Sequence, residues 1–283
     1  MTISFTEVLV PLDGSPFAER AIDIALEIAE RTGSHVTLMS CAAAEDAKTR
    51  ATYLADLVRG DARRAHVGTV VCEDESAARA ISHLSRAETL VCMSSHGRGW
   101  SEALLGSVAE SVLRELRTPI VVVGPHVPAH AWLGAGRIVA CIDGTAETAV
   151  LLEPAAELAR SLGMPLWLTE VVSRDVGLDE AGSDVIETST LMAAARKLGN
   201  AVEGWDVLHD SNPARALIDH AASGPVSMFV LAPRGTSGWH RLAAGSTTAT
   251  VVHHAGVPVL VVPTALDRSG EPTHPAEPAA TAS

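Results

Sequence analysis

Two glycine-bearing segments of the sequence have residue types that suit the binding of a phosphate group. They read SSHGRGWSEALLGS at 94–107 and APRGTSGWHRLAAGS at 232–246. Each ends in Gly-Ser at the start of a helical pattern, where free N–H groups and the helix dipole attract anions. The alternative is structural, with each serine as an N-cap and the glycines as turn residues. The candidate residues are Gly97, Gly106, Ser107, Gly235, Gly245 and Ser246.

Two aspartates follow apolar runs at matching places in the chain. Asp13 begins Asp-Gly-Ser, and Asp143 begins Asp-Gly-Thr. A carboxylate at such a position could accept a hydrogen bond from a ribose hydroxyl. Asp-Gly is also a common turn pair, because the aspartate side chain can order the turn by itself. Both interpretations stay open at the level of these residues alone.

The sequence lacks the motifs of several other common nucleotide-binding, hydrolase and metal sites. A Walker P-loop needs GxxxxGK[ST], and Lys48 and Lys197, the two lysines, lie in no such loop. The GxG of the first segment lacks a third glycine, and the GxSxG of a hydrolase nucleophile does not occur. The twelve histidines are scattered, and His253 and His254 are expected on different sides of a helix. We therefore predict no catalytic residues and no metal site built by the protein.

An internal repeat shows which elements position these residues. The stretch EVLVPLDGSPFAERAIDIALEIAERTGSHVTLMSC near the start parallels RIVACIDGTAETAVLLEPAAELARSLGMPLWLTEVV in the second half, and 104–123 parallels 242–262. Matching landmarks in the same order indicate a duplicated domain. We predict a first domain at 1–127, a linker at 128–135, a second domain at 136–265 and a disordered tail at 266–283, which is rich in proline and lacks large apolar residues.

Each half alternates predicted strands with predicted helices. Strands are expected near 7–12, 36–41, 67–72, 89–93 and 120–124, and near 137–142, 165–172, 205–209, 226–231 and 258–262. Helices are expected near 16–31, 46–60, 75–86 and 106–117, and near 146–162, 184–199, 213–222 and 246–255. This order predicts α/β domains with doubly wound parallel sheets and helices on both faces. Such sheets bind ligands at the carboxyl ends of their strands. All the candidate residues fall on this edge, either at a strand end or at a helix N-terminus.

Composition restricts the partners. The formal net charge of −13 makes nucleic acid and anionic membrane surfaces unfavourable partners. No apolar stretch reaches the ~18 residues of a membrane span, and the first residues lack the basic start of a signal peptide. The four cysteines form no CxxC pair and are expected to be reduced. These features predict a cytoplasmic protein.

The Asp-Gly-Ser/Thr after the first strand, the SHGRG loop and the LLGSVAESVL helix start resemble the universal stress protein family in its tandem form. The resemblance covers about 5–124 and 136–263. It implies a five-stranded parallel sheet in each half, and ATP bound through a Gly-x2-Gly-x9-Gly-Ser/Thr loop, the first-strand aspartate and the residues that end the second strand. Carried to this chain, these positions are Pro11, Asp13, Cys41, Ser94, Gly97, Gly106 and Ser107, and Asp143, Val171, Ala232, Gly235, Gly245 and Ser246.

Each half departs from the family pattern in a different way. Ser94 and Ala232 stand where the pattern has its first glycine. The first half has eight residues between its two loop glycines, whereas the second has the expected nine. Cys141 stands where the first half has Pro11. We predict that at least one half binds ATP, with the loop of the second half the better match.

The resulting hypothesis is a tandem stress-response protein that binds ATP, with Mg²⁺ on the phosphates, and acts through a protein partner without efficient catalysis. The valine-rich last strands are candidates for strand pairing. The family resemblance implies that they pair domain with domain, and a homodimer through them is a further possibility. The alternative is a degenerate protein that binds no nucleotide and serves as an interaction or dimerisation module. A nucleotidyl-transfer enzyme is a third possibility, but it would need a catalytic set that the sequence does not display.

Overall fold

The computed structural model describes residues 5–59, 63, 66–97, 105–115, 118–173, 180–233 and 246–263, with the backbone alone at 146–147 and 180–188. The first half contains β1 (Glu7–Pro11), α1 (Pro16–Thr32), β2 (His35–Ala42), α2 (Ala47–Val58), β3 (Gly68–Glu73), α3 (Ala77–Leu84), β4 (Thr89–Ser94), α4 (Ser107–Glu115) and β5 (Ile120–Val123). The second contains β6 (Arg137–Ile142), α5 (Ala146–Ala149), α6 (Leu152–Leu162), β7 (Leu166–Val172), α7 (Glu180–Leu198), β8 (Gly204–His209), α8 (Pro213–Ser223), β9 (Val226–Leu231), α9 (Thr247–His254) and β10 (Val259–Val261). The predicted tail at 266–283 lies outside the described residues.

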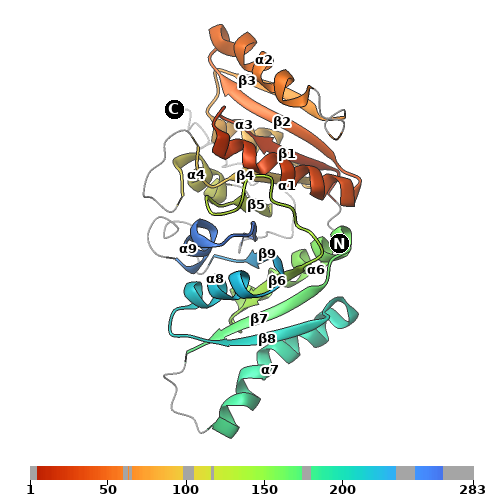
Figure 1. Ribbon diagram of the computed structural model, residues 1–283, viewed down its shortest axis with the longest axis vertical. Coiled ribbons are helices and arrows are strands. Elements are labelled where there is room, and N and C mark those ends of the chain that lie inside the picture. The colour runs from red at the N-terminus through yellow and green to blue at the C-terminus, as the bar shows by residue number, and fades with distance from the viewer. Residues whose placement is uncertain are drawn as a thin grey trace, which may run out of the picture.

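The ten strands form one continuous sheet in the order β3-β2-β1-β4-β5-β10-β9-β6-β7-β8 (Figure 1). Strands within each half are parallel, so each half is the predicted five-stranded doubly wound sheet. The halves join where β10 pairs antiparallel with β5, placing Leu260 opposite Val121. The predicted pairing of the last strands is confirmed. Because both strands are paired on either side, a homodimer would need another surface.

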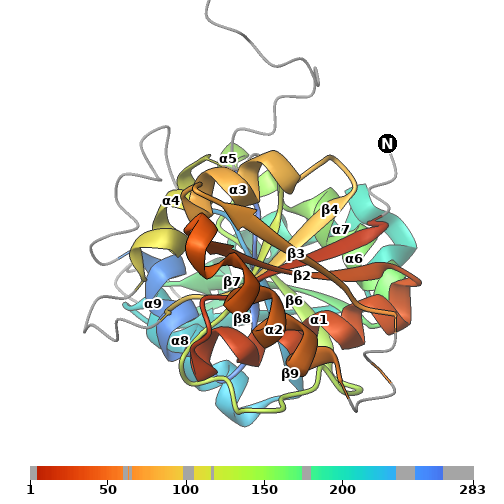
Figure 2. The ribbon, with the colours of Figure 1, turned by 90° about the horizontal axis from the view of Figure 1, so that it is seen from above.

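Helices cover both faces of the twisted sheet (Figures 1 and 2). One core packs α1, α2, α6 and α7 against the sheet, and the other packs α3, α4, α8 and α9 against its opposite face. Successive residues of a buried strand supply the two cores in turn, as Val8 and Leu9 of β1 do. This double burial explains why the strands are continuous apolar runs in the sequence. Among the described helices, none is long and apolar enough to span a membrane.

The helix predicted over 146–162 is wrong in one respect, because the chain forms α5 and α6 with a break at Val150 and Leu151. Pro154 is the third residue of α6. It has no N–H to donate to the carbonyl of Val150, and its ring would crowd that carbonyl in a continuous helix. The other predicted elements lie within a few residues of the observed ones, since apolar runs and turn residues mark their ends.

Helix α1 begins and ends as its sequence requires. The Ser15 hydroxyl accepts a hydrogen bond from the N–H of Ala18 at 3.2 Å, and Pro16 occupies the first helical position. Gly33 ends the helix with φ of 72°, a left-handed conformation that suits glycine. The buried face of α1 then fixes the turn after β1, where Asp13 lies.

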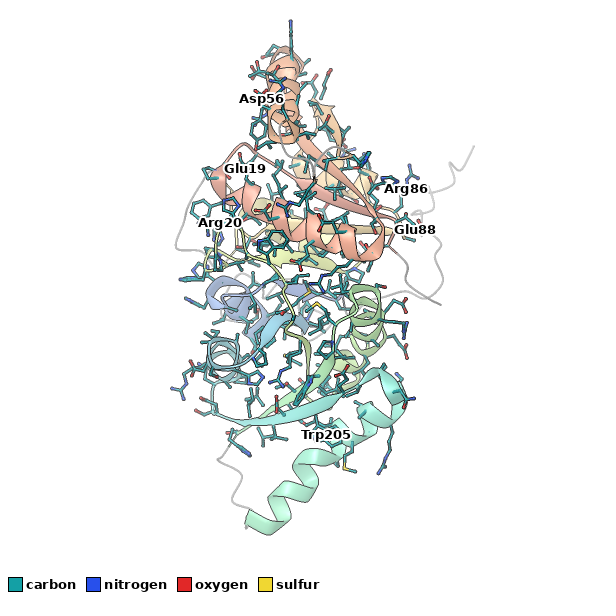
Figure 3. All side chains as sticks on the ribbon, turned by 45° about the vertical axis from the view of Figure 1, so that its right-hand side comes forward. Glu19, Arg20, Asp56, Arg86, Glu88 and Trp205 are labelled. Atoms are coloured by element: carbon teal, nitrogen blue, oxygen red, sulfur yellow. The ribbon has the colours of Figure 1, made fainter. Side chains whose placement is uncertain are left out.

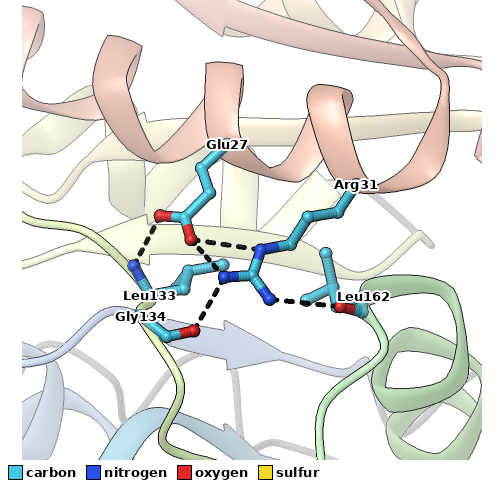
Figure 4. A network of polar contacts seen from close by, with 5 residues as sticks. All are labelled: Glu27, Arg31, Leu133, Gly134 and Leu162. Atoms are coloured by element: carbon cyan, nitrogen blue, oxygen red, sulfur yellow. Dashed lines mark hydrogen bonds and ion pairs between the residues drawn. The ribbon is translucent and has the colours of Figure 1, made fainter.

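One side of α1 also holds the segment that joins the halves. The Glu27 carboxylate accepts hydrogen bonds from Arg31 at 2.7 Å and from the N–H of Leu133 at 2.6 Å (Figure 4). Arg31 in turn donates to the carbonyls of Gly134 at 2.7 Å and Leu162 at 3.2 Å. A single helix of the first half is thereby bonded to the connecting segment and to α6 of the second half.

The same side of α1 makes further contacts with the connecting segment. Arg20, which is labelled in Figure 3, donates to the carbonyls of Pro125 at 2.7 Å and Val127 at 3.2 Å. The buried carboxylate of Asp23 bonds His130 at 2.7 Å. Arg20, Asp23, Glu27 and Arg31 are spaced three or four residues apart, which aligns them along a helix. The connection between the halves is therefore built on a polar stripe of α1.

Candidate functional site

A cavity of about 320 Å³ lies at the carboxyl ends of β1, β2 and β4, beside the start of α4. It lies on the edge where doubly wound sheets bind ligands, since β1 connects to β2 on one side and is flanked by β4 on the other. Every site residue predicted in the first half lines it. These residues are Pro11, Asp13, Cys41, Ser94, Gly97, Gly106 and Ser107.

Asp13 is held at the cavity by the turn that follows β1. Its Oδ1 accepts the N–H of Ser15 at 2.9 Å, and Gly14 permits the turn with φ of 84°. Its other oxygen, Oδ2, lies against Gly97, where any Cβ would overlap the carboxylate. Glycine at 97 thus leaves room for the Asp13 carboxylate between two loops.

The segment before α4 is held against the end of β4 through backbone contacts. The N–H of Gly106 donates to the carbonyl of Ser95 at 2.8 Å, and a Cβ at Gly106 would lie 3.2 Å from that oxygen. Helix α4 begins at Ser107, so the interpretation of this serine as the N-cap is wrong and Gly106 precedes the helix. Ser107, Val108 and Ala109 of the first turn of α4 line the cavity, so the N-terminus of this helix lies beside it. Residues 98–104 lie outside the described part of the chain.

The remaining wall is mainly apolar. Met39, Met93, Ala77 and Val108 line it together with Cys41. Burial, with the neighbouring Cys72 thiol, raises the pKa of Cys41 to about 11, so this thiol is neutral near pH 7. The cavity combines an apolar wall, a carboxylate on one side and a helix start on the other. This arrangement suits a ligand with a flat apolar part, hydroxyl groups and an anionic end.

Sequence reasoning missed His96, which lines the cavity and is almost fully buried. Its Nδ1 lies 2.9 Å from the Ser95 hydroxyl, and its ring centre is 5.4 Å from that of His253 in α9. Its position in SSHG, directly after an apolar strand, is the feature of the sequence that could have indicated a place in the cavity. The local sequence could not indicate its contact with His253 of the second half.

The second half arranges its corresponding aspartate differently. Asp143 Oδ1 accepts hydrogen bonds from the hydroxyls of Thr145 at 2.6 Å and Thr148 at 2.8 Å, and from the Thr145 N–H at 3.1 Å. In the first half the residue corresponding to Thr148 is Ala18, which lines the cavity and has no hydroxyl. The two aspartates thus occupy equivalent turns but have different hydrogen-bond partners.

The other predicted residues of the second half are only partly within the described chain. Val171 lies near the end of β7, and Ala232 follows β9 and is buried. Ser246 caps α9, since its hydroxyl accepts the N–H of Ala249 at 3.2 Å, as the structural interpretation expected. Gly235 and Gly245 lie outside the described residues. That the loop of the second half is the better match for ATP binding therefore stays a prediction.

The expectation that the histidines are scattered is wrong. His253 and His254 have ring centres 4.6 Å apart, and His126 from the first half lies beside both. His253 and His254 are the last two residues of α9. His126 could not be associated with the other two from the sequence, because it lies more than a hundred residues away along the chain.

Comparison with known proteins agrees with this architecture. The universal stress protein family model matches residues 4–124 and 134–263. The chain is 24 % identical over 291 residues to Universal stress protein Rv2623 of Mycobacterium tuberculosis, covering 90 % of this chain and 95 % of that protein. It is 27 % identical over 194 residues to Universal stress protein Rv2005c of the same species, a match that spans 63 % of each chain and thus less than two thirds of that relative.

A solved structure shares the whole fold. A universal stress protein from Archaeoglobus fulgidus aligns with a TM-score of 0.67 and 18 % identity over 92 % of this chain and 98 % of its own. The two family matches cover both halves, and each half carries the same parallel sheet. The chain is a tandem member of the universal stress protein family.

Proposed function

We propose that the first half of this protein binds ATP in the cavity between β1, β4 and α4. The observation that carries the proposal is that seven residues chosen from the sequence line one cavity of about 320 Å³. This volume lies at the lower end of the range typical of small-molecule sites. It suits an adenosine group, with the phosphates extending toward the opening.

Each part of the nucleotide has a matching feature. Asp13 would accept hydrogen bonds from the ribose hydroxyls, and the apolar wall at Met39 and Met93 would contact the adenine. The N–H groups at the start of α4, next to Gly106, would receive the phosphates. The absence of a Cβ at Gly97 and Gly106 keeps both loops close to Asp13 and Ser95. Mg²⁺ would enter with the phosphates.

The hydrogen bonds of Asp143 support the first half over the second. The hydroxyls of Thr145 and Thr148 occupy the carboxylate oxygen that a ribose would need. We propose a protein that signals its nucleotide state to a partner in the cytoplasm, without efficient turnover. Among the described residues that line the cavity, Asp13 is the one that carries a carboxylate, and its Oδ1 accepts the N–H of Ser15. We assign this carboxylate to the ribose, which is consistent with binding without efficient turnover.

A pair of matched substitutions tests the site. ATP with Mg²⁺ is titrated by calorimetry into wild type, Asp13→Asn and Asp143→Asn, and the nucleotide released from natively purified protein is identified. Losing a hydrogen bond from a charged group costs about 1.5–3 kcal/mol, so Asp13→Asn should weaken binding by about ten-fold or more. Asp143→Asn should bind like wild type.

Three results are informative. Binding lost in Asp143→Asn but kept in Asp13→Asn would move the site to the second half. Equal binding in both variants would contradict the role of the aspartate. No released nucleotide and no heat at millimolar ATP would contradict the proposal and favour a degenerate interaction module.

A further inference from the structure

Three histidines from the two halves meet on the surface next to the junction. His126 follows β5, and His253 and His254 are the last residues of α9. One ring nitrogen of each lies within 4.8 Å of the other two. His126 and His254 are exposed, and His253 is partly buried. We name this group the junction histidines.

The backbone fixes the positions of the junction histidines. Gly124 lies so close to the carbonyl of Val252 that any Cβ at 124 would overlap it. The Nδ1 of His126 lies 2.7 Å from the carbonyl oxygen of His253. Together with the pairing of β5 and β10, these contacts hold the end of α9 against the chain that leaves β5. The cluster is therefore part of the junction and not a chance meeting of long side chains.

The hydrogen bond of His126 also fixes the tautomer of its neutral ring. A carbonyl oxygen only accepts, so Nδ1 of His126 must carry the proton and donate. The neutral ring then has its lone pair on Nε2. Metal-binding histidines commonly use this arrangement, in which one nitrogen donates to a backbone carbonyl and the other binds the ion.

We propose that the junction histidines bind one divalent transition-metal ion of the Zn²⁺, Co²⁺ or Ni²⁺ class. Imidazole nitrogen suits these ions, whereas Mg²⁺ and Ca²⁺ prefer oxygen. Three histidines and a water molecule make a common four-coordinate site. Ligands about 2.0–2.1 Å from one zinc ion lie about 3.4 Å apart, so small rotations of the two exposed rings complete the site. The negative end of the α9 dipole adds attraction for a cation.

Such an ion would bridge the two halves of the chain. It would bind His126 from the first half and His253 and His254 from the second. The ring of His96 packs edge-on against His253 and would hold that ligand in place from the cavity side. Because the bridged state exists only in the folded protein, the ion should raise the melting temperature as its concentration increases. The proposal does not depend on nucleotide binding.

Metal binding is measured on the untagged full chain after chelator treatment. Zn²⁺ and Co²⁺ are titrated by calorimetry, and Co²⁺ is also followed by its visible absorption, which reports nitrogen ligands and four-fold coordination. Wild type should bind one equivalent and melt at a higher temperature. His126→Ala and His254→Ala should each weaken binding by about ten-fold or more. Both side chains are exposed, so folding should be kept, and circular dichroism checks this.

Two controls separate this site from others. His35→Ala removes an exposed histidine of β2, and Asp13→Asn alters only the proposed nucleotide cavity. Both should bind metal like wild type. The proposal is overturned by absence of saturable binding at micromolar Zn²⁺ or Co²⁺, or by His126→Ala and His254→Ala binding as tightly as wild type. In the second case the metal is held elsewhere.

Discussion

At the residue scale, the two halves differ in the hydrogen-bond partners of the aspartate that the repeat places after the first strand of each half. Asp13 and Asp143 occupy equivalent turns, yet the Thr148 hydroxyl bonds Asp143, whereas the corresponding residue of the first half, Ala18, has no hydroxyl and lines the cavity. The sequence predicted both aspartates because the repeat and strand ends locate them. It did not predict the bond from Thr148, because a threonine in a helical pattern has no signature of its hydrogen-bond partner.

This difference leads to a direct exchange experiment. Ala18→Thr should place a hydroxyl and a methyl group in the cavity beside Asp13, as Thr148 does beside Asp143. Both effects compete with a ribose, so the affinity for ATP should fall by about ten-fold or more, measured by calorimetry. Thr148→Ala is the matched control and should keep ATP binding while lowering stability by about 1–3 kcal/mol. Unchanged affinity in Ala18→Thr would argue against ribose at Asp13.

At the element scale, periodicity predicted the strands and helices but not their polar contacts. The pattern of α1 identifies a helix with a buried face, and Ser15 and Gly33 mark its ends. Nothing in that pattern shows that Glu27 is buried, because Leu133, which donates its N–H to the Glu27 carboxylate, lies about a hundred residues further along. Pro154, in contrast, is a local sequence signal for the break before α6.

The buried carboxylate of α1 should be important for stability. Glu27→Ala would leave the N–H of Leu133 without its acceptor and Arg31 without its ion pair. We expect the free energy of unfolding to fall by about 3 kcal/mol, measured by urea denaturation. The exposed ion pair between Asp56, labelled in Figure 3, and Arg59 provides the control, and Asp56→Ala should change stability by less than about 1 kcal/mol. Equal effects would mean that Glu27 adds no more than a surface ion pair.

At the scale of the whole molecule, the sequence indicated two repeats but only the family resemblance indicated how they join. Two apolar last strands can pair within the chain or between chains, and composition does not distinguish these arrangements. The structure places β5 and β10 at the centre of one ten-stranded sheet. The meeting of His126 with α9 follows from this pairing, which is why it could not be predicted from scattered histidines.

Gly124 offers a test of the junction as a unit. A Cβ at this position would overlap the carbonyl of Val252, a backbone atom that cannot rotate away. Gly124→Ala should therefore force β5 and the end of α9 apart and lower stability by about 1–3 kcal/mol or more. Gly68→Ala is the control, since its Cβ would meet Thr37 at an ordinary 3.5 Å. Thermal melting measures both variants. If Gly124→Ala has the melting temperature of wild type, the junction between the halves does not depend on this close contact. If its melting temperature falls and it also binds Zn²⁺ more weakly, the junction positions the histidines as well as the strands.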